Sequence, residues 1–87
     1  ALIFFCFLSE VACVKYLRDS EGIKKFGERV RKIRLQKKIS QENLAYEAGL
    51  EYSQISRIER GIINTSISHV FAIASALDVE PSELFRF

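Results

Sequence analysis

Residues 40–61, SQENLAYEAGLEYSQISRIERG, constrain the fold of this chain more than any other stretch, because they place two short helices around a single glycine. Ser40 is suited to cap the first helix, since its side-chain oxygen can accept from an unpaired backbone N–H. Leu44 and Ala48 follow at helical spacing. Gly49 predicts the end of this helix, because glycine adopts positive φ without a Cβ clash and lets the chain turn sharply.

A second helix is predicted from about Tyr52 to Arg60. Its apolar residues Ile55 and Ile58 are spaced to face inward, which makes the segment a helix-turn-helix. The opposite face carries hydrogen-bonding groups of the kind that read base edges in DNA. These outward side chains are Tyr52, Ser53, Gln54 and Arg57.

The segment resembles the lambda repressor and Cro type (XRE-like) of helix-turn-helix transcriptional regulators. The resemblance extends to both sides, from FGERVRKIRLQKK at residues 26–38 to HVFAIASALDVEPSELF at residues 69–85. Its most specific elements are Gln41, Ala45, Gly49 and the run ISRIERG at residues 55–61. The resemblance implies an all-α, compact five-helix bundle that binds double-stranded DNA.

The spacing of apolar residues agrees with that bundle. Phe26, Val30 and Ile33 form one face of a first helix, and Thr65 or Ser66 can cap a fourth. Pro81 suits the first turn of a last helix. The inward positions expected in the last two helices are Ile67, Val70, Ile73, Ala74, Leu77, Leu84 and Phe85.

Lys38 stands where the family often has glycine or asparagine, at the break before Ser40. The residue therefore either adopts a left-handed backbone conformation at some energetic cost, or the turn differs slightly from that of the family.

The net charge is only +2, but the basic residues are concentrated in and around the first helix, with Glu28 as a single acid among them. This asymmetry favours a polyanionic partner. The alternative is a solvated helix face without a ligand. The basic residues of this run are Lys24, Lys25, Arg29, Arg31, Lys32, Arg34, Lys37 and Lys38.

No pattern typical of an enzyme, a metal site, a cofactor or a small-molecule substrate is found in the sequence. Cys6 and Cys13 lie seven residues apart without a CxxC motif, and we interpret them as reduced thiols in a cytoplasmic protein of a prokaryote or phage. His69 is interpreted as a surface residue at a helix start.

The segment 1–22 is interpreted as an apolar N-terminal extension and linker, with Arg18–Gly22 leading into a DNA-binding domain at 23–87. A membrane span is not expected, because Glu10 interrupts the apolar run well before the ~20 residues that a span needs. Three alternatives stay open for residues 1–17. They are an arm that packs on the domain or on a second subunit, an artefact of where the reading frame begins, and a membrane association.

Arg57 is the strongest candidate among the predicted base-reading residues, because a guanidinium can donate twice to guanine O6 and N7. Gln54 could pair with adenine, and Ser53 with several bases. The Tyr52 ring could contact a thymine methyl group, or its hydroxyl a phosphate; the alternative is that the ring only packs. The Glu51 carboxylate would repel nearby phosphates, unless it accepts a hydrogen bond from cytosine or serves mainly as a helix cap.

The family resemblance also implies phosphate contacts on either side of the second helix, from Ser40, Gln41, Arg60 and Asn64. It further implies a structural ion pair between Arg34 and Glu59, which removes Arg34 from the DNA contacts. Ile62 and Ile63 stand where the family often has basic residues, so this loop is expected to offer apolar surface to a partner subunit instead.

A domain of this size reads few base pairs, which predicts a homodimer on a palindromic operator with half-sites ~34 Å apart. The candidate dimer surfaces are the last helix with Phe85 and Phe87, the Ile62–Ile63 loop and the N-terminal extension. The systems that fit are a restriction-modification controller, a phage repressor and an antitoxin. The alternative function is a protein-interaction module, for example an antitoxin-like one, that keeps the helical fold without binding an operator.

Overall fold

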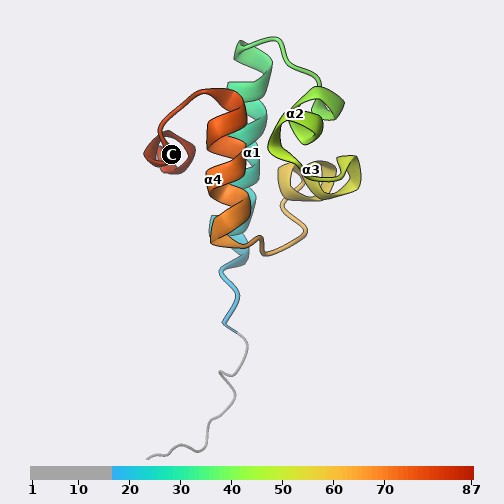
Figure 1. The fold of residues 1–87 in the computed structure, drawn as a ribbon. Coiled ribbons are helices and arrows are strands. Elements are labelled where there is room, and N and C mark those ends of the chain that lie inside the picture. The colour runs from blue at the N-terminus through green and yellow to red at the C-terminus, as the bar shows by residue number, and fades with distance from the viewer. Residues whose placement is uncertain (1–16) are drawn as a thin grey trace, which may run out of the picture.

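The computed structural model describes residues 17–87, which form four α-helices and one 3-10 helix (Figure 1). The elements are α1 (Ser20–Gln36), α2 (Gln41–Ala48), α3 (Tyr52–Glu59), α4 (Ile67–Leu77) and η1 (Pro81–Phe85). The predicted all-α class is confirmed, but the fifth element is a short 3-10 helix rather than an α-helix. The expectations for residues 1–16, including both cysteines, lie outside the described residues. Within residues 17–87, no helix combines the length and the apolar character that crossing a membrane requires.

α1 begins at Ser20, before the domain boundary predicted at residue 23. Asp19 is the N-cap residue, and its side chain accepts from the backbone N–H of Gly22 at 2.9 Å. The stretch Arg18–Gly22 is therefore not a linker throughout, because its second half is the first turn of α1.

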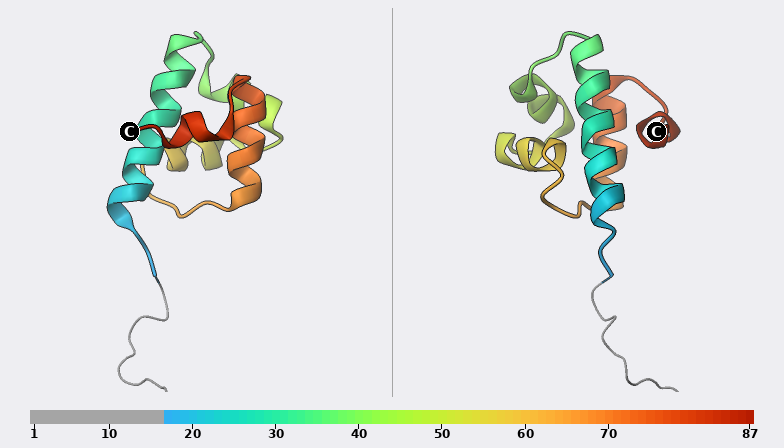
Figure 2. Two further views of the ribbon diagram at one scale, coloured as in Figure 1. Left: turned by 90° about the vertical axis from the view of Figure 1, so that its left-hand side faces the viewer. Right: turned by 180° about the vertical axis from the view of Figure 1, so that it is seen from behind.

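The other elements of the bundle lie on two sides of α1 and α4. α2 and α3 lie on one side of these helices, and η1 with the C-terminus lies on the other, as the views in Figures 1 and 2 agree. α1 contacts both α3 and η1, and α4 contacts both α2 and η1. The helix-turn-helix is thus presented on a face of its own.

The core is a single cluster to which every element contributes. Five of the seven inward positions predicted for the last two helices are buried, as are Ile55 and Ile58. Full burial of an aliphatic side chain contributes about 1.5–3 kcal/mol. The core residues are Phe26, Val30, Ile33, Leu44, Ala45, Ile55, Ile58, Val70, Ile73, Ala74, Leu77 and Leu84.

Two residues predicted to be buried are not. Ile67 is 67% exposed, because it is the first residue of α4 and lies at the rim of an open groove rather than over the core. Phe85 is 50% exposed, because one side of its ring packs on Phe26, with ring centroids 5.3 Å apart, while the rest faces solvent.

The turn between α1 and α2 contains a left-handed lysine. Lys38 has φ 59°, which confirms the first of the two alternatives predicted for this position. The backbone N–H of Lys38 donates to Leu35 O at 3.1 Å, and that of Ile39 donates to Arg34 O at 3.1 Å, so the conformation is held by the end of α1.

We therefore expect Lys38→Gly to raise the free energy of unfolding by about 1 kcal/mol, because glycine adopts positive φ without the Cβ clash. Urea unfolding at neutral pH measures the change. Lys37→Gly is the matched control, since Lys37 has φ −89° and the same substitution should destabilise there. Equal effects at the two positions would show that backbone strain at Lys38 is negligible.

Candidate nucleic-acid interface

The turn between α2 and α3 is built as the sequence predicts. The Ser40 hydroxyl oxygen accepts from the backbone N–H of Asn43 at 3.0 Å, which confirms Ser40 as the N-cap of α2. Gly49 ends α2 with φ 74°, and the next residue, Leu50, donates its backbone N–H to Ala45 O at 2.9 Å. Only three residues, Gly49, Leu50 and Glu51, separate the two helices, so α3 starts almost at once.

α3 buries one face and exposes the other. Ile55 and Ile58 are in the core, whereas Ser53 and Arg57 are exposed and the Tyr52 ring is 53% exposed. Gln54 is half-buried at the edge of the same outward surface. The four predicted base-reading residues therefore come together in the first two turns of one helix face.

Glu51 and Gln54 close the start of α3. Glu51 is the N-cap residue, and its backbone N–H donates to Gln54 Oε1 at 3.0 Å. The Glu51 carbonyl oxygen accepts from the backbone N–H groups of Gln54 and Ile55 at 3.0 and 3.2 Å. This agrees with the helix-cap alternative for Glu51 and gives Gln54 a structural role that the sequence reading missed.

The residues predicted to contact phosphates differ in their exposure and in how many hydrogen bonds their side chains make within the protein. Arg60 is exposed, and its Nε donates to Ser56 O at 3.3 Å, while Asn64 is exposed in the loop after α3. The Ser40 oxygen serves as the cap described above, which leaves its hydroxyl proton available. The Gln41 side chain instead donates through Nε2 to Glu59 Oε1 at 2.9 Å, so its main contact is internal.

A buried polar network joins the first three helices behind this surface. Arg34 Nε of α1 donates to Glu59 Oε2 of α3 at 2.6 Å, and Arg34 Nη2 donates to Glu59 Oε1 at 3.1 Å. Arg34 Nη1 donates to the Ile39 carbonyl at 2.8 Å. The side chains of Arg34 and Glu59 are only 9% and 1% exposed, so this is the ion pair expected from the family resemblance, and neither group is available to DNA.

Two of the basic residues on α1 are likewise bonded to other groups within the protein. Arg29 donates through Nε to the Glu83 carbonyl at 2.8 Å and pairs with the Glu83 carboxylate at 3.4 Å, which ties η1 to α1. With Arg34 also engaged, two cations of the run hold the fold. The remaining cations of the run are exposed, namely Lys24, Lys25, Arg31, Lys32, Lys37 and Lys38.

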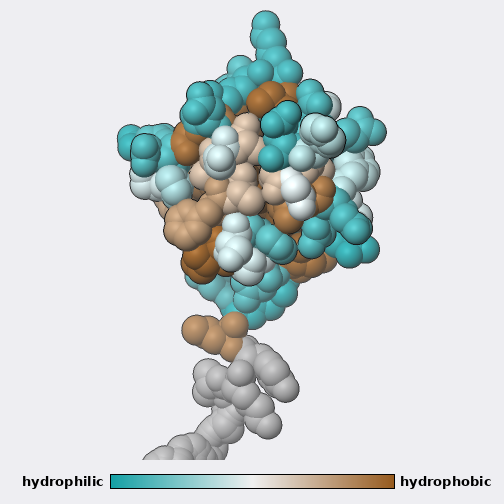
Figure 3. Space-filling model, in the orientation of Figure 1, coloured by the Kyte–Doolittle hydropathy of each residue, from teal (hydrophilic) through white to brown (hydrophobic). Residues whose placement is uncertain are grey.

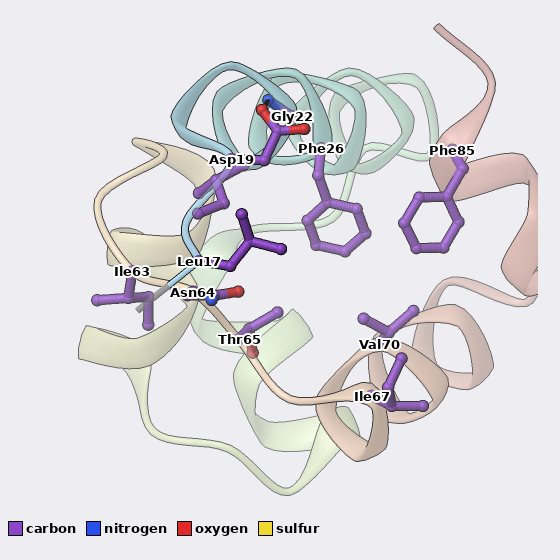
Figure 4. Close-up of a pocket in the computed structure, with 11 residues that line it drawn as sticks. Leu17, Asp19, Gly22, Phe26, Ile63, Asn64, Thr65, Ile67, Val70 and Phe85 are labelled. Carbon is purple, nitrogen blue, oxygen red and sulfur yellow. Dashed lines mark hydrogen bonds between the residues drawn. The ribbon is translucent and has the colours of Figure 1, made fainter. Parts of the chain in front are cut away.

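Apolar side chains gather away from α3. An open groove of about 330 Å³ runs between the start of α1, the loop after α3, the start of α4 and η1, as Figure 4 shows. Ile63 lines this groove and is partly buried against the core, whereas Ile62 is 47% exposed. Of the two isoleucines predicted to offer apolar surface, Ile62 is therefore the more exposed.

A second apolar surface covers the outer side of α4, where Figure 3 shows hydrophobic residues gathered on the face toward the viewer. Ile67 and Phe71 lie one turn apart on α4, and both are more than half exposed. Phe85 and Phe87 add exposed aromatic area from the C-terminal segment. The sequence held a signal for Phe71, since its position falls off the stripe formed by Val70, Ile73, Ala74 and Leu77.

Comparisons with known proteins agree with this geometry. A family model described as "Helix-turn-helix" matches residues 30–84. The chain is 48% identical over 63 residues to "Control protein C.BamHI" of Bacillus amyloliquefaciens, which covers 71% of this chain and 78% of that protein. It is 38% identical over 58 residues to the "Immunity repressor protein" of Bacillus phage phi105, of which it covers 40%.

Solved structures give the same result. The crystal structure of the restriction-modification controller protein C.AhdI from Aeromonas hydrophila matches with a TM-score of 0.72 and 46% sequence identity. The match covers 72% of this chain and 96% of that chain. The wild-type restriction-modification controller protein C.Esp1396I matches with a TM-score of 0.72 and 36% identity over 77% of this chain and 87% of that one.

Proposed function

The chain belongs to the helix-turn-helix family of DNA-binding transcriptional regulators, and we propose that it reads double-stranded operator DNA through the outward face of α3. The observation that carries this proposal is the division of α3 into a buried side, with Ile55 and Ile58, and an exposed polar side. A helix of this kind enters the major groove with its N-terminal residues toward the bases. The alternative of an interaction module that does not bind DNA is not favoured by the relatives, which are control and repressor proteins.

Base selection falls to Tyr52, Ser53, Gln54 and Arg57 in this proposal. Arg57 carries the largest share, because it is exposed one turn into α3 and its guanidinium can donate twice to guanine. The Tyr52 ring has enough exposed area to contact a thymine methyl group.

Affinity comes from phosphate contacts that hold α3 in register. Ser40 and the free backbone N–H groups at the start of α2 are donors to one phosphate, supported by the positive end of the helix dipole. Arg60 and Asn64 are donors beyond the other end of α3. Gln41 contributes less through its side chain than the family resemblance implies, since Glu59 already accepts from its amide.

Two copies of the chain are needed to read an operator, and we place their contact on the exposed apolar surface of α4 and the C-terminal segment. Ile67, Phe71, Phe85 and Phe87 give this surface exposed aliphatic and aromatic area of the kind that protein interfaces cover. A two-fold axis through the pair would present two α3 helices to half-sites ~34 Å apart, and so predicts a palindromic operator.

The test is selection of bound duplexes from a random DNA pool at two salt concentrations, with the wild type and Arg57→Ala. The wild type should recover a palindromic motif whose binding weakens steeply with salt. Arg57→Ala should lose about 1–3 kcal/mol of base discrimination, roughly 5- to 150-fold, at one position in each half-site.

Lys32→Ala is the control, because Lys32 is exposed on α1 and not on α3. It should weaken binding to all duplexes alike, if it has any effect. Unchanged unfolding of both variants in urea would show that the fold is intact. If Arg57→Ala kept full selectivity at every position, Arg57 would not be a base-reading residue.

A further inference from the structure

One end of the Gln54 side-chain amide is already hydrogen-bonded within the protein when no DNA is bound. Its Oε1 accepts from the backbone N–H of Glu51 at 3.0 Å, at the start of α3. A glutamine amide can accept only through its oxygen and donate only through its nitrogen. The bond therefore fixes the orientation of the amide: the oxygen faces the backbone of Glu51, and Nε2 with its two N–H groups is left for a ligand.

This orientation restricts which base Gln54 can recognise. Pairing with adenine in the major groove uses both ends of the amide, because the oxygen accepts from N6 while the nitrogen donates to N7. With its oxygen bonded to the Glu51 N–H, Gln54 offers both N–H groups of Nε2 to a base, whereas pairing with adenine would require the same oxygen to accept a second hydrogen bond, from N6. Guanine offers two acceptors, O6 and N7, and thymine offers one, O4. Adenine offers one acceptor, N7, beside its N6 donor, and cytosine offers only a donor at N4.

We propose that Gln54 is a donor-only specificity residue, which selects guanine or thymine in each half-site and rejects cytosine, rather than pairing with adenine through both ends of its amide. This inference rests on the proposed function, since it assigns a base class to one residue of that same surface. It replaces the adenine pairing that the residue type alone suggests.

We expect the hydrogen bond between the Glu51 N–H and Gln54 Oε1 to persist when DNA is bound. Glu51 has its carbonyl oxygen occupied by two backbone N–H groups and its own N–H occupied by Gln54, so both backbone polar groups of this residue are bonded. In the free protein, water could replace Gln54 at the Glu51 N–H. Where DNA covers the start of α3, turning the amide around would leave this N–H without a protein acceptor, so that only a bridging water could replace the bond.

Gln54→Glu separates the two roles of the side chain. A glutamate at this position keeps an oxygen for the Glu51 N–H, so the cap and the thermal unfolding of the protein should not change. The donating nitrogen becomes a second acceptor oxygen, which should favour cytosine. The added negative charge weakens binding to every duplex, but this effect cancels in the ratio of affinities for two duplexes that differ at one base pair.

The experiment selects bound duplexes from a random pool with the wild type and with Gln54→Glu, and then measures affinities for the recovered motif with single base changes. We expect one position in each half-site at which the wild type takes guanine or thymine and Gln54→Glu takes cytosine, with a reversal of preference of at least tenfold. All other positions should stay the same. Gln54→Leu should lose preference at the same position and also unfold at lower temperature, because it can neither cap nor donate.

Three results would overturn the inference. Adenine at the Gln54 position, together with weaker binding when its N6 amino group is removed by substituting purine, would show that the amide turns around on DNA. Identical motifs for the wild type and Gln54→Glu would show that Gln54 does not read bases. Recovery of no motif by the wild type would reject the proposed function itself, a failure that is distinct from the other two because it does not involve Gln54.

Discussion

Arg34→Met should lower the free energy of unfolding by about 3–5 kcal/mol, the loss typical of removing one partner from a buried ion pair. The substitution leaves the Glu59 carboxylate, whose side chain is 1% exposed, with the Gln41 amide as its one remaining side-chain partner among the described contacts. It also removes the donor from the Ile39 carbonyl, which Arg34 Nη1 meets at 2.8 Å. Urea unfolding of the variant and the wild type gives the difference.

Two controls define the cause of that loss. Arg29→Met removes a cation from the same helix, but the Arg29–Glu83 pair is longer at 3.4 Å and more exposed, so about 1 kcal/mol or less is expected from the loss of its charge interaction. The double variant Arg34→Met, Glu59→Met should recover most of the stability, because no unpaired charge is then buried. A double variant as unstable as Arg34→Met would mean that the network acts through packing rather than charge.

The Arg34 network also bears on DNA binding, although it does not reach the surface. Glu59, the last residue of α3, accepts from Arg34 of α1 and from Gln41, the first residue of α2. The Gln41–Glu59 hydrogen bond therefore ties the start of α2 to the end of α3 through the ion pair that stabilises the fold. The proposed base readout needs α3 held in place, since it depends on the position of each side chain.

The parts of the fold that could be predicted from the sequence are those set by local chemistry. Ser40 caps α2 and Gly49 ends it because the needed side chain and backbone freedom are properties of single residues. The inward stripe of α1 follows from helical spacing alone. The left-handed conformation of Lys38 was one of two alternatives left open by the sequence, and it is the one that the structure shows.

The parts that could not be predicted depend on tertiary contacts or on a choice among partners. Ile67 continues the apolar stripe of α4, but it is 67% exposed at the rim of the groove, and only the tertiary packing decides this. Gln41 could have donated to a phosphate or to Glu59, and only the placement of α3 decides between them. The Gln54 cap is different, because a glutamine three residues after an N-cap is itself a sequence signal for a capping box. This contact was therefore predictable, although Gln54 was interpreted only as a base-reading residue.

Gly27→Ala is the second substitution with a large expected effect, about 3 kcal/mol of destabilisation at the upper end of the usual range for overpacking. A Cβ at position 27 would clash with the Ile58 carbonyl oxygen and would lie 2.9 Å from that of Glu59. Both atoms belong to the backbone at the end of α3, so no side chain can move aside. Instead, α1 and α3 must separate at the closest point of their contact. Thermal and urea unfolding measure the effect.

Gly22→Ala, on the same helix, makes the comparison decisive. There the added Cβ would meet the Asp19 carboxylate at 2.8 Å, and this flexible side chain can shift. Alanine is favoured over glycine inside a helix by about 1 kcal/mol, so Gly22→Ala should be close to neutral or stabilising. Helix propensity alone predicts the same gain at Gly27. Opposite signs at the two glycines would therefore isolate the α1–α3 contact, whereas a neutral Gly27→Ala would show that α3 can shift on α1 at little cost. In that case the buried network around Glu59, rather than backbone contact, would be what holds α3 in position.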